Sequence, residues 1–269
     1  MAILKGANRR LKPLKPLKPL PVRTLAPNIL TLLSLCAGMT SIRFGLDGRW
    51  EFAVMAIMVA AIFDALDGSI ARALKGATKF GAELDSLSDV VSFGVAPALL
   101  LYNWTLKDLG GLGWVVALLF TICCALRLAR FNTVTEEERE AAPWKVHYYT
   151  GVPVPAGAGL SLLPLFIAFQ FELEFSRIPI LSAVLMMAVS FLMVSKIPTY
   201  SFKRLGIRRD YVLPLLIAIG LIAAFLTSYL WGTVMMFGVI YLATLPFSIG
   251  DYRSEKSSYL EQSEAAAEK

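Results

Sequence analysis

The run FDALDGSIARALKGATKFGAELDSLSDVVSFG, residues 63–94, places Asp64, Asp67, Asp85 and Asp89 in an otherwise apolar part of the chain. The four acids lie at the ends of two apolar stretches that are each long enough to span a bilayer. A carboxylate at membrane depth costs several kcal/mol unless it is paired. Nearby basic residues cannot pair with all four acids. The run therefore predicts a divalent metal site formed by two membrane helices.

The composition of the whole chain excludes a soluble globular domain. Of the 269 residues, 57% are hydrophobic and 17% are charged, against about 45–50% and about 25% in soluble domains. The sequence predicts an all-α, polytopic membrane helix bundle of about eight transmembrane helices, and Pro153, Pro155 and Pro164 interrupt the fifth. The expected spans are 27–46, 50–70, 84–104, 112–132, 151–170, 178–195, 211–228 and 231–249.

The basic residues predict the orientation of this bundle. With the N-terminus in the cytoplasm and eight spans, 22 of the 26 Lys and Arg residues fall on the cytoplasmic side. Both termini and the aspartates are then expected to face the cytoplasm. No cleavable signal peptide is expected, because the first apolar run begins only after 26 residues. The expected organisation is a basic, Pro-rich tail (1–26), one membrane domain (27–250) and a polar tail (251–269).

Helical spacing suggests how the acids meet. Asp64 and Asp67 are three residues apart, and Asp85 and Asp89 are four apart, so each pair shares one face of a helix. Two such faces turned toward each other suit Mg²⁺ or Mn²⁺, which favour oxygen ligands.

Small residues and a guanidinium group accompany these acids. Gly68, Ala71 and Gly81 leave room for a bulky ligand or for close helix packing. Together with Arg72 and a metal, they describe a site for a phosphorylated ligand. An ion or proton pathway is the alternative, because intramembrane acids also form those.

The spacing Asp64-x2-Asp67-Gly68-x2-Ala71-Arg72-x8-Gly81-x3-Asp85-x3-Asp89 resembles, position for position, the signature of the CDP-alcohol phosphatidyltransferases. The resemblance implies that CDP-diacylglycerol gives its phosphatidyl group to an alcohol and releases CMP. It implies that Asp64, Asp67 and Asp85 bind the metal, and that Asp89 also contributes a ligand and acts as general base. It further implies a nucleotide site formed by Asp67, Gly68, Ala71, Arg72 and Gly81.

Four other segments resemble the membrane-embedded bacterial phosphatidylserine synthases within that family, which implies L-serine as the acceptor. They are APNILTLLSLCAGMTSI (26–42), ALRLARFNT (125–133), GVPVPAGAG (151–159) and SKIPTYSFK (195–203). Ser34 departs from this pattern, because Asn is expected there.

Arg127, Arg130 and Asn132 close the fourth apolar segment on the same side as the aspartates. They are candidates for binding the serine carboxylate or a phosphate group. The simpler interpretation is a topology anchor for the arginines and a helix cap for Asn132.

The function expected from this resemblance is transfer of a phosphatidyl group to L-serine with Mg²⁺ or Mn²⁺. The protein is expected to be a homodimer in the bacterial inner membrane, with no nucleic-acid partner. One alternative is a sister enzyme that uses glycerol 3-phosphate, inositol phosphate or choline. The other is a cation- or proton-coupled transporter.

Overall fold

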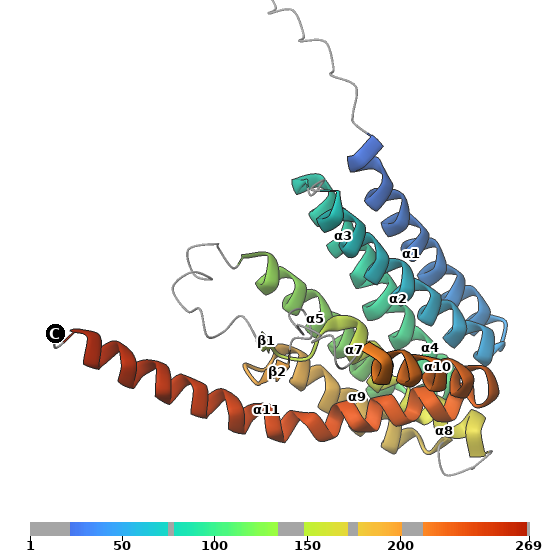
Figure 1. The fold of residues 1–269 in the computed structure, drawn as a ribbon. Coiled ribbons are helices and arrows are strands. Elements are labelled where there is room, and N and C mark those ends of the chain that lie inside the picture. Colours follow the sequence, from blue (N-terminus) through green and yellow to red (C-terminus); the bar gives the residue numbers. More distant parts are fainter. Residues whose placement is uncertain (1–21, 75–77, 134–147, 172–176, 201–211, 268–269) are drawn as a thin grey trace, which may run out of the picture.

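The computed structural model describes residues 22–74, 78–133, 148–171, 177–200 and 212–267 (Figure 1). These residues form a helical bundle with one short two-stranded ladder. The helices are α1 (Val22–Leu46), α2 (Trp50–Ala73), α3 (Lys79–Asp89), η1 (Val90–Val95), α4 (Ala96–Trp104), η2 (Leu106–Leu109), α5 (Gly111–Thr133), α7 (Val154–Ser161), α8 (Leu163–Phe171), α9 (Pro179–Val194), α10 (Val212–Ser228) and α11 (Leu230–Ala267); the strands are β1 (Tyr148–Thr150) and β2 (Pro198–Tyr200).

The protein is an all-α membrane bundle with five or six candidate spans. Each of the eight predicted apolar segments is helical, but α9 and α10 have only 16 and 17 residues. At about 1.5 Å per residue they reach roughly 25 Å, less than the ~30 Å hydrocarbon core. Eight spans therefore remain a prediction. Five helical segments are long and apolar enough to cross a membrane: Leu25–Leu46, Trp50–Ala73, Lys79–Trp104, Gly111–Thr133 and Leu230–Tyr252.

The sixth candidate span is the interrupted fifth segment. Helices α7 and α8 meet at Leu162 with a bend of 44°. Pro164 occupies the first turn of α8, where a missing N–H breaks no helical hydrogen bond, and Pro155 occupies the same place in α7. The predicted interruption is confirmed next to Pro164, whereas Pro153 and Pro155 lie at the start of α7.

The third span contains a π-helical turn that directly follows Asp89. Over Val90–Val95 the chain widens, and the Ala96 N–H bonds to the Val91 carbonyl five residues back. Pro97 follows at once and has no N–H to donate. The helix then continues as α4, so α3, η1 and α4 form one apolar segment of 26 residues. Such π turns often occur at functional sites.

Helices α1 and α2 pack side by side along their length, and α1 also packs against the third span (Figure 1). Gly38 permits a close approach between α1 and the third span, because a Cβ atom there would lie 2.7 Å from the Ser92 Cα atom. Interhelical hydroxyl bonds accompany this contact. Ser34 Oγ donates to the Ala60 carbonyl at 2.9 Å, and Ser92 Oγ donates to the Ser34 carbonyl at 3.2 Å. Small residues and hydroxyl groups are typical contacts between membrane helices.

The ladder joins the chain ahead of α7 to the chain after α9. Strands β1 and β2 are antiparallel, with Tyr149 opposite Thr199. Gly151 makes the tight turn that follows β1, with φ of 77°, and its N–H bonds to the Ile197 carbonyl. Ser248 on α11 donates to the Pro198 carbonyl at 2.9 Å, so the ladder also anchors the last helix.

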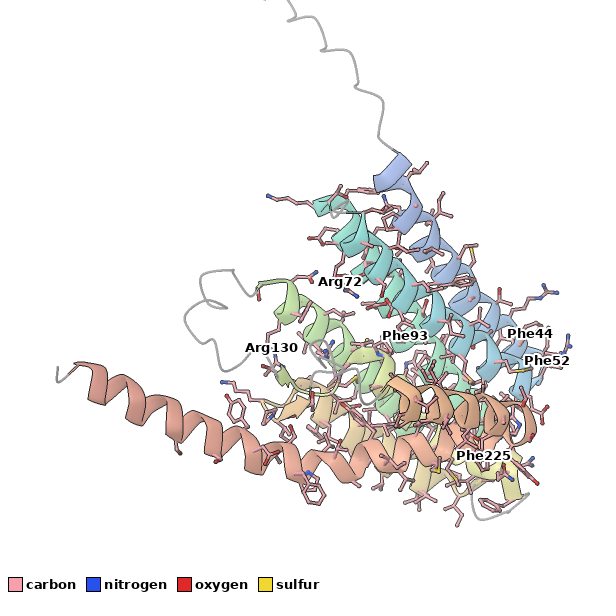
Figure 2. All side chains as sticks on the ribbon, viewed as in Figure 1. Phe44, Phe52, Arg72, Phe93, Arg130 and Phe225 are labelled. Atoms are coloured by element: carbon pink, nitrogen blue, oxygen red, sulfur yellow. The ribbon has the colours of Figure 1, made fainter. Side chains whose placement is uncertain are left out.

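The two ends of the bundle differ in chemistry. Figure 2 shows Arg72 and Arg130 toward the end that carries the aspartates, and Phe44 and Phe52 toward the other. At that other end the Arg49 guanidinium lies over both phenyl rings, 5.0 and 4.2 Å from their centroids. Residues 1–21 of the predicted Pro-rich tail lie outside the described residues. At the other end of the chain, helix α11 extends into the predicted polar tail as far as Ala267.

Candidate functional site

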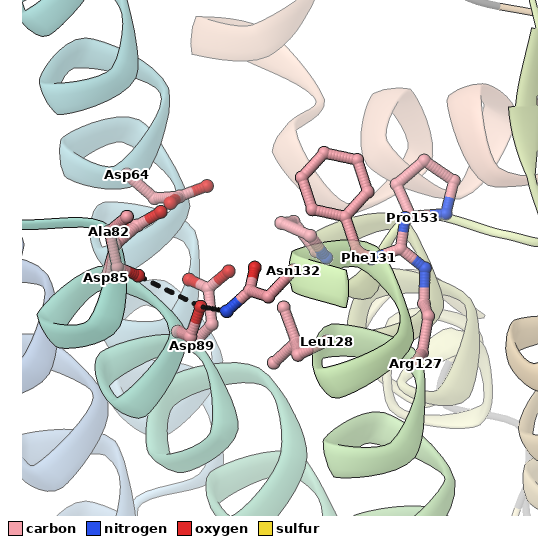
Figure 3. A pocket seen from close by; sticks show the side chains of 11 residues that line it. Asp64, Ala82, Asp85, Asp89, Arg127, Leu128, Phe131, Asn132 and Pro153 are labelled. Atoms are coloured by element: carbon pink, nitrogen blue, oxygen red, sulfur yellow. Dashed lines mark hydrogen bonds between the residues drawn. The ribbon is translucent and has the colours of Figure 1, made fainter. Parts of the chain in front are cut away.

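Asp64 and Asp67 on α2 lie close to Asp85 on α3, and Figure 3 shows Asp89 near Asp64 and Asp85. The connection is short, and Thr78 begins α3 by accepting a hydrogen bond from the Gly81 N–H at 3.0 Å. Ligand oxygens of Asp64, Asp67 and Asp85 lie within 4.8 Å of one another. Two oxygens on opposite sides of Mg²⁺ are about 4.2 Å apart, since each bond is about 2.1 Å. Small side-chain movements would therefore bring these three carboxylates onto one cation.

Asp89 lies beside this group of three. It is only 8% exposed, and its carboxyl is within hydrogen-bonding reach of Asp64. Asp85 Oδ1 and Asp89 Oδ1 are buried and accept no hydrogen bond from a described residue. None of the four acids forms an ion pair with a described Lys or Arg side chain. Buried carboxylates without partners are costly, so an all-oxygen set with free lone pairs fits Mg²⁺ or Mn²⁺.

A cavity of about 320 Å³ opens from the acids toward α5 and the start of α7 (Figure 3). Acids line one wall and Arg127 lies on the opposite wall. The lining residues are Asp64, Ala82, Asp85, Ser86, Asp89, Arg127, Leu128, Phe131, Asn132, Pro153 and Pro155. Helix α2, the third span, α5 and the start of the broken fifth segment thus line one cavity, which has charged groups on two walls.

The three acceptor candidates on α5 differ sharply in their surroundings. Arg127 is 8% exposed, lines the cavity and leaves its Nε atom without a hydrogen-bond partner among the described residues. Arg130 donates to the carbonyls of Val194 at 2.8 Å and Ser195 at 3.2 Å, which close the C-terminus of α9. A further bond of 3.4 Å reaches the Thr150 carbonyl. Arg130 therefore connects α5 to α9 and the ladder.

Asn132, at the end of α5, also lines the cavity and reaches across to α3. Its Nδ2 atom donates to Ser86 Oγ on α3 at 2.8 Å (Figure 3). This bond ties the end of α5 to the helix that carries Asp85 and Asp89. The simple prediction of a helix cap missed this contact, because Ser86 carries no signal in the sequence that sets it apart from other helix-surface serines.

The residues expected to bind the nucleotide cluster around the α2–α3 connection, outside the cavity lining. Arg72 is exposed, and its only hydrogen bond to a described residue is to Ser69 Oγ at 3.3 Å. A Cβ atom at Gly68 would lie 3.4 Å from Arg72 Nη1, and one at Gly81 would lie 2.9 Å from Asn28 Oδ1. Ala71 follows Gly68 by one turn on α2. The glycines thus also make room for neighbouring side chains.

Two further polar side chains near the site were not predicted from the sequence. Thr31 on α1 donates to Asp67 Oδ2 at 2.6 Å. Tyr241 on α11 has a buried hydroxyl and lies near Thr199 and Arg127. Each is one of several uncharged polar residues in its helix, so only the three-dimensional arrangement associates it with the site.

Comparison with known proteins agrees with this arrangement. The sequence profile of the CDP-alcohol phosphatidyltransferase family matches residues 24–245. The CDP-diacylglycerol–serine O-phosphatidyltransferase of Mycobacterium leprae is 36% identical over 231 residues, which cover 85% of this chain and 76% of the relative. The enzyme of the same name from Helicobacter pylori is 33% identical, over 80% of this chain and 90% of the relative.

A relative with a different name is similar over a shorter part of the chain. The archaetidylserine synthase of Methanothermobacter thermautotrophicus is 36% identical over 176 residues, which cover 64% of this chain and 67% of the relative. The family match includes all four aspartates and every described residue that lines the cavity. The resemblance inferred from the aspartate spacing is thereby confirmed: the chain belongs to the CDP-alcohol phosphatidyltransferase family.

Proposed function

We propose that this protein transfers the phosphatidyl group of CDP-diacylglycerol to the hydroxyl group of L-serine, which produces phosphatidylserine and CMP. The observation that carries this proposal is the agreement between the relatives and the site. Relatives named for this reaction are 33% to 38% identical over most of the chain. The family match over residues 24–245 includes the acid cluster and the cavity next to it.

The acids have a metal-binding role in this proposal. Asp64, Asp67 and Asp85 would hold Mg²⁺ or Mn²⁺, with Asp89 as a further ligand, and a cation bound there would supply neutralisation of the diphosphate charge and polarisation of the phosphoryl oxygens. The support is the spacing of the three carboxylates within 4.8 Å and the absence of a described Lys or Arg partner.

Asp89 is the proposed general base. Its carboxyl is buried and lines the cavity, so an alcohol bound there reaches it directly. Asp89 takes the proton from the serine hydroxyl as the serine oxygen bonds to phosphorus. The bond between that phosphorus and the oxygen of CMP breaks, and CMP leaves. The proton then resides on Asp89.

The nucleotide is proposed to bind at the connection between α2 and α3. Asp67, Gly68, Ala71, Arg72 and Gly81 surround this point. Arg72 is exposed and held only by Ser69 of its own helix among the described residues, so its guanidinium is free to turn toward a phosphate group.

Arg127 is proposed to bind the serine carboxylate. It is the only Lys or Arg among the described residues that line the cavity. A single buried guanidinium suits an acceptor with one carboxylate, whereas a phosphorylated acceptor would require more positive charge. In this proposal Arg130 and Asn132, the other two acceptor candidates, hold the wall of the cavity, because their side chains are already bonded to α9 and to Ser86.

The setting of the enzyme is also proposed. The excess of Lys and Arg on one side predicts that both termini and the site face the cytoplasm. The inner membrane of a bacterium is proposed from the resemblance to bacterial enzymes. A homodimer is proposed from the resemblance to the family, and the mass of the purified protein in detergent, corrected for bound detergent, tests it.

The acceptor is tested with purified protein in lipid nanodiscs. CDP-diacylglycerol and Mn²⁺ are supplied with L-serine, glycerol 3-phosphate, inositol phosphate or choline, and CMP release is measured. We expect rapid CMP release with L-serine alone among these alcohols. If CMP is released with another alcohol and not with serine, the acceptor is assigned wrongly while the family remains correct.

A further inference from the structure

One threonine of the first helix contacts both of the helices that carry the acids. Thr31 Oγ1 donates to Asp67 Oδ2 on α2 at 2.6 Å. On α3, Ser88 Oγ donates to the Thr31 carbonyl at 3.1 Å. Ser88 directly precedes Asp89. Thr31, Asp67 and Ser88 are at most 4% exposed, so water does not compete for these bonds.

The same helix face repeats this arrangement one turn away, without an acid. Ser34 Oγ donates to α2 at the Ala60 carbonyl, and the Ser34 carbonyl accepts from Ser92 of the third span. Thr31 and Ser34 therefore bridge the same three segments with the same kinds of bond. They differ in one respect, because the acceptor of Thr31 on α2 is the carboxylate of Asp67.

The Thr31 hydroxyl has one hydrogen and two acceptors within reach, the Asp67 carboxylate and the Pro27 carbonyl, and the bond to the carboxylate is the stronger. The Thr31 hydroxyl lies 2.6 Å from Asp67 Oδ2 and 3.1 Å from the Pro27 carbonyl of its own helix. Hydroxyl bonds to a charged carboxylate are shorter and about twice as strong as neutral ones. The bond fixes the rotation of the Asp67 carboxylate, and thus the direction in which its oxygens face Asp64 and Asp85.

We propose that Thr31 is a positioning residue for the metal site: it holds Asp67 in the orientation that completes the three-carboxylate group. The proposal rests on the metal role within the proposed function, but not on the identity of the acceptor alcohol. Groups that orient a metal ligand typically change metal affinity by about 10- to 100-fold when they are removed. If Thr31 served helix packing alone, its removal would leave the metal affinity unchanged.

The test is Mn²⁺ binding, measured from the EPR signal of free Mn²⁺, with purified protein and with neither nucleotide nor alcohol present. Thr31→Val keeps the shape of the side chain and removes the hydroxyl, and Thr31→Ser keeps the hydroxyl. Ser34→Ala is the matched control, because it removes an equivalent interhelical bond that does not reach an acid. Thr31→Ala is measured in parallel, so that the hydroxyl is tested even where valine disturbs the packing.

We expect Thr31→Val and Thr31→Ala to weaken Mn²⁺ binding by about 10-fold or more. Thr31→Ser should bind within about 3-fold of the wild-type protein. Ser34→Ala should lower the thermal midpoint and leave the Mn²⁺ dissociation constant unchanged.

Wild-type affinity in a folded Thr31→Val or Thr31→Ala variant overturns the proposal. An equal loss of affinity in Ser34→Ala also overturns it, because the effect would then follow from helix packing. If the wild-type protein itself binds no Mn²⁺, the metal role of the proposed function fails together with this inference. Since the assay contains no alcohol, a wrong acceptor assignment leaves its result unaffected.

Discussion

Replacement of Arg127 by methionine tests how the acceptor is recognised. Arg127 is 8% exposed, lines the cavity and keeps its Nε free of any described partner. Methionine occupies a similar length without the charge. A hydrogen bond to a charged group contributes about 1.5–3 kcal/mol, which corresponds to roughly a 10- to 150-fold change in an equilibrium constant. We therefore expect the KM for serine to rise by about 10- to 100-fold in Arg127→Met.

The assay compares L-serine with ethanolamine, which has the same reacting hydroxyl but no carboxylate. CMP release is measured for both alcohols at saturating CDP-diacylglycerol and Mn²⁺. The wild-type protein should strongly prefer serine, and Arg127→Met should lose most of that preference because serine falls toward the level of ethanolamine. Unchanged discrimination in a folded Arg127→Met variant would refute the assignment of the carboxylate site.

Arg130→Met provides the matched control on the same helix. Its guanidinium donates to three backbone carbonyls, of Val194, Ser195 and Thr150, at 2.8, 3.2 and 3.4 Å. Hydrogen bonds of a charged group contribute about 1.5–3 kcal/mol each, and these three bonds join parts of the fold, so the loss is mainly one of stability. The thermal midpoint should fall, while the ratio of serine to ethanolamine turnover stays near that of the wild-type protein.

Three further substitutions test other parts of the account. Asp89→Asn should lower turnover by about 10²- to 10⁴-fold and leave CDP-diacylglycerol binding largely intact, as measured by equilibrium binding of labelled lipid; near-normal turnover removes Asp89 as the base. Asp67→Ala should weaken Mn²⁺-dependent binding of CDP-diacylglycerol, and an unaltered dependence on Mn²⁺ concentration would contradict its role as a ligand. Gly38→Val should lower the thermal midpoint, because a Cβ atom there would lie 2.7 Å from the Ser92 Cα atom; a midpoint equal to that of the wild-type protein would show that the helices separate without cost.

Residue spacing in the sequence was sufficient to predict that the aspartates converge. The intervals of three and four residues place each pair on one helix face, and α1 packs against both α2 and α3. Burial of a carboxylate in an apolar helix is costly enough that the faces turn toward each other and toward a cation. The grouping of Asp64, Asp67 and Asp85 follows from these two facts.

The partners of the arginines could not be predicted in the same way. Arg127 and Arg130 are one turn apart on α5 and look equivalent in the sequence. Their difference depends on α9, whose C-terminal carbonyls lie within reach of Arg130 but not of the cavity. That contact joins residues more than 60 positions apart, and no local pattern in either segment encodes it.

Hydropathy alone could not predict the number of membrane spans, because it does not give the length of each helix. Hydropathy identifies α9 and α10 as apolar, but at 16 and 17 residues they fall short of a full crossing. The π turn after Asp89 was not predicted either, because the sequence VVSFGVAP is compatible with a regular helix until Pro97 removes a donor.

A diffraction measurement at the manganese absorption edge, on crystals soaked with Mn²⁺, tests the role of the acids most directly. We expect an anomalous peak within about 2.5 Å of carboxylate oxygens from Asp64, Asp67 and Asp85. A fully soaked crystal with no peak between α2 and α3, or with Mn²⁺ bound only elsewhere on the protein, would contradict the account.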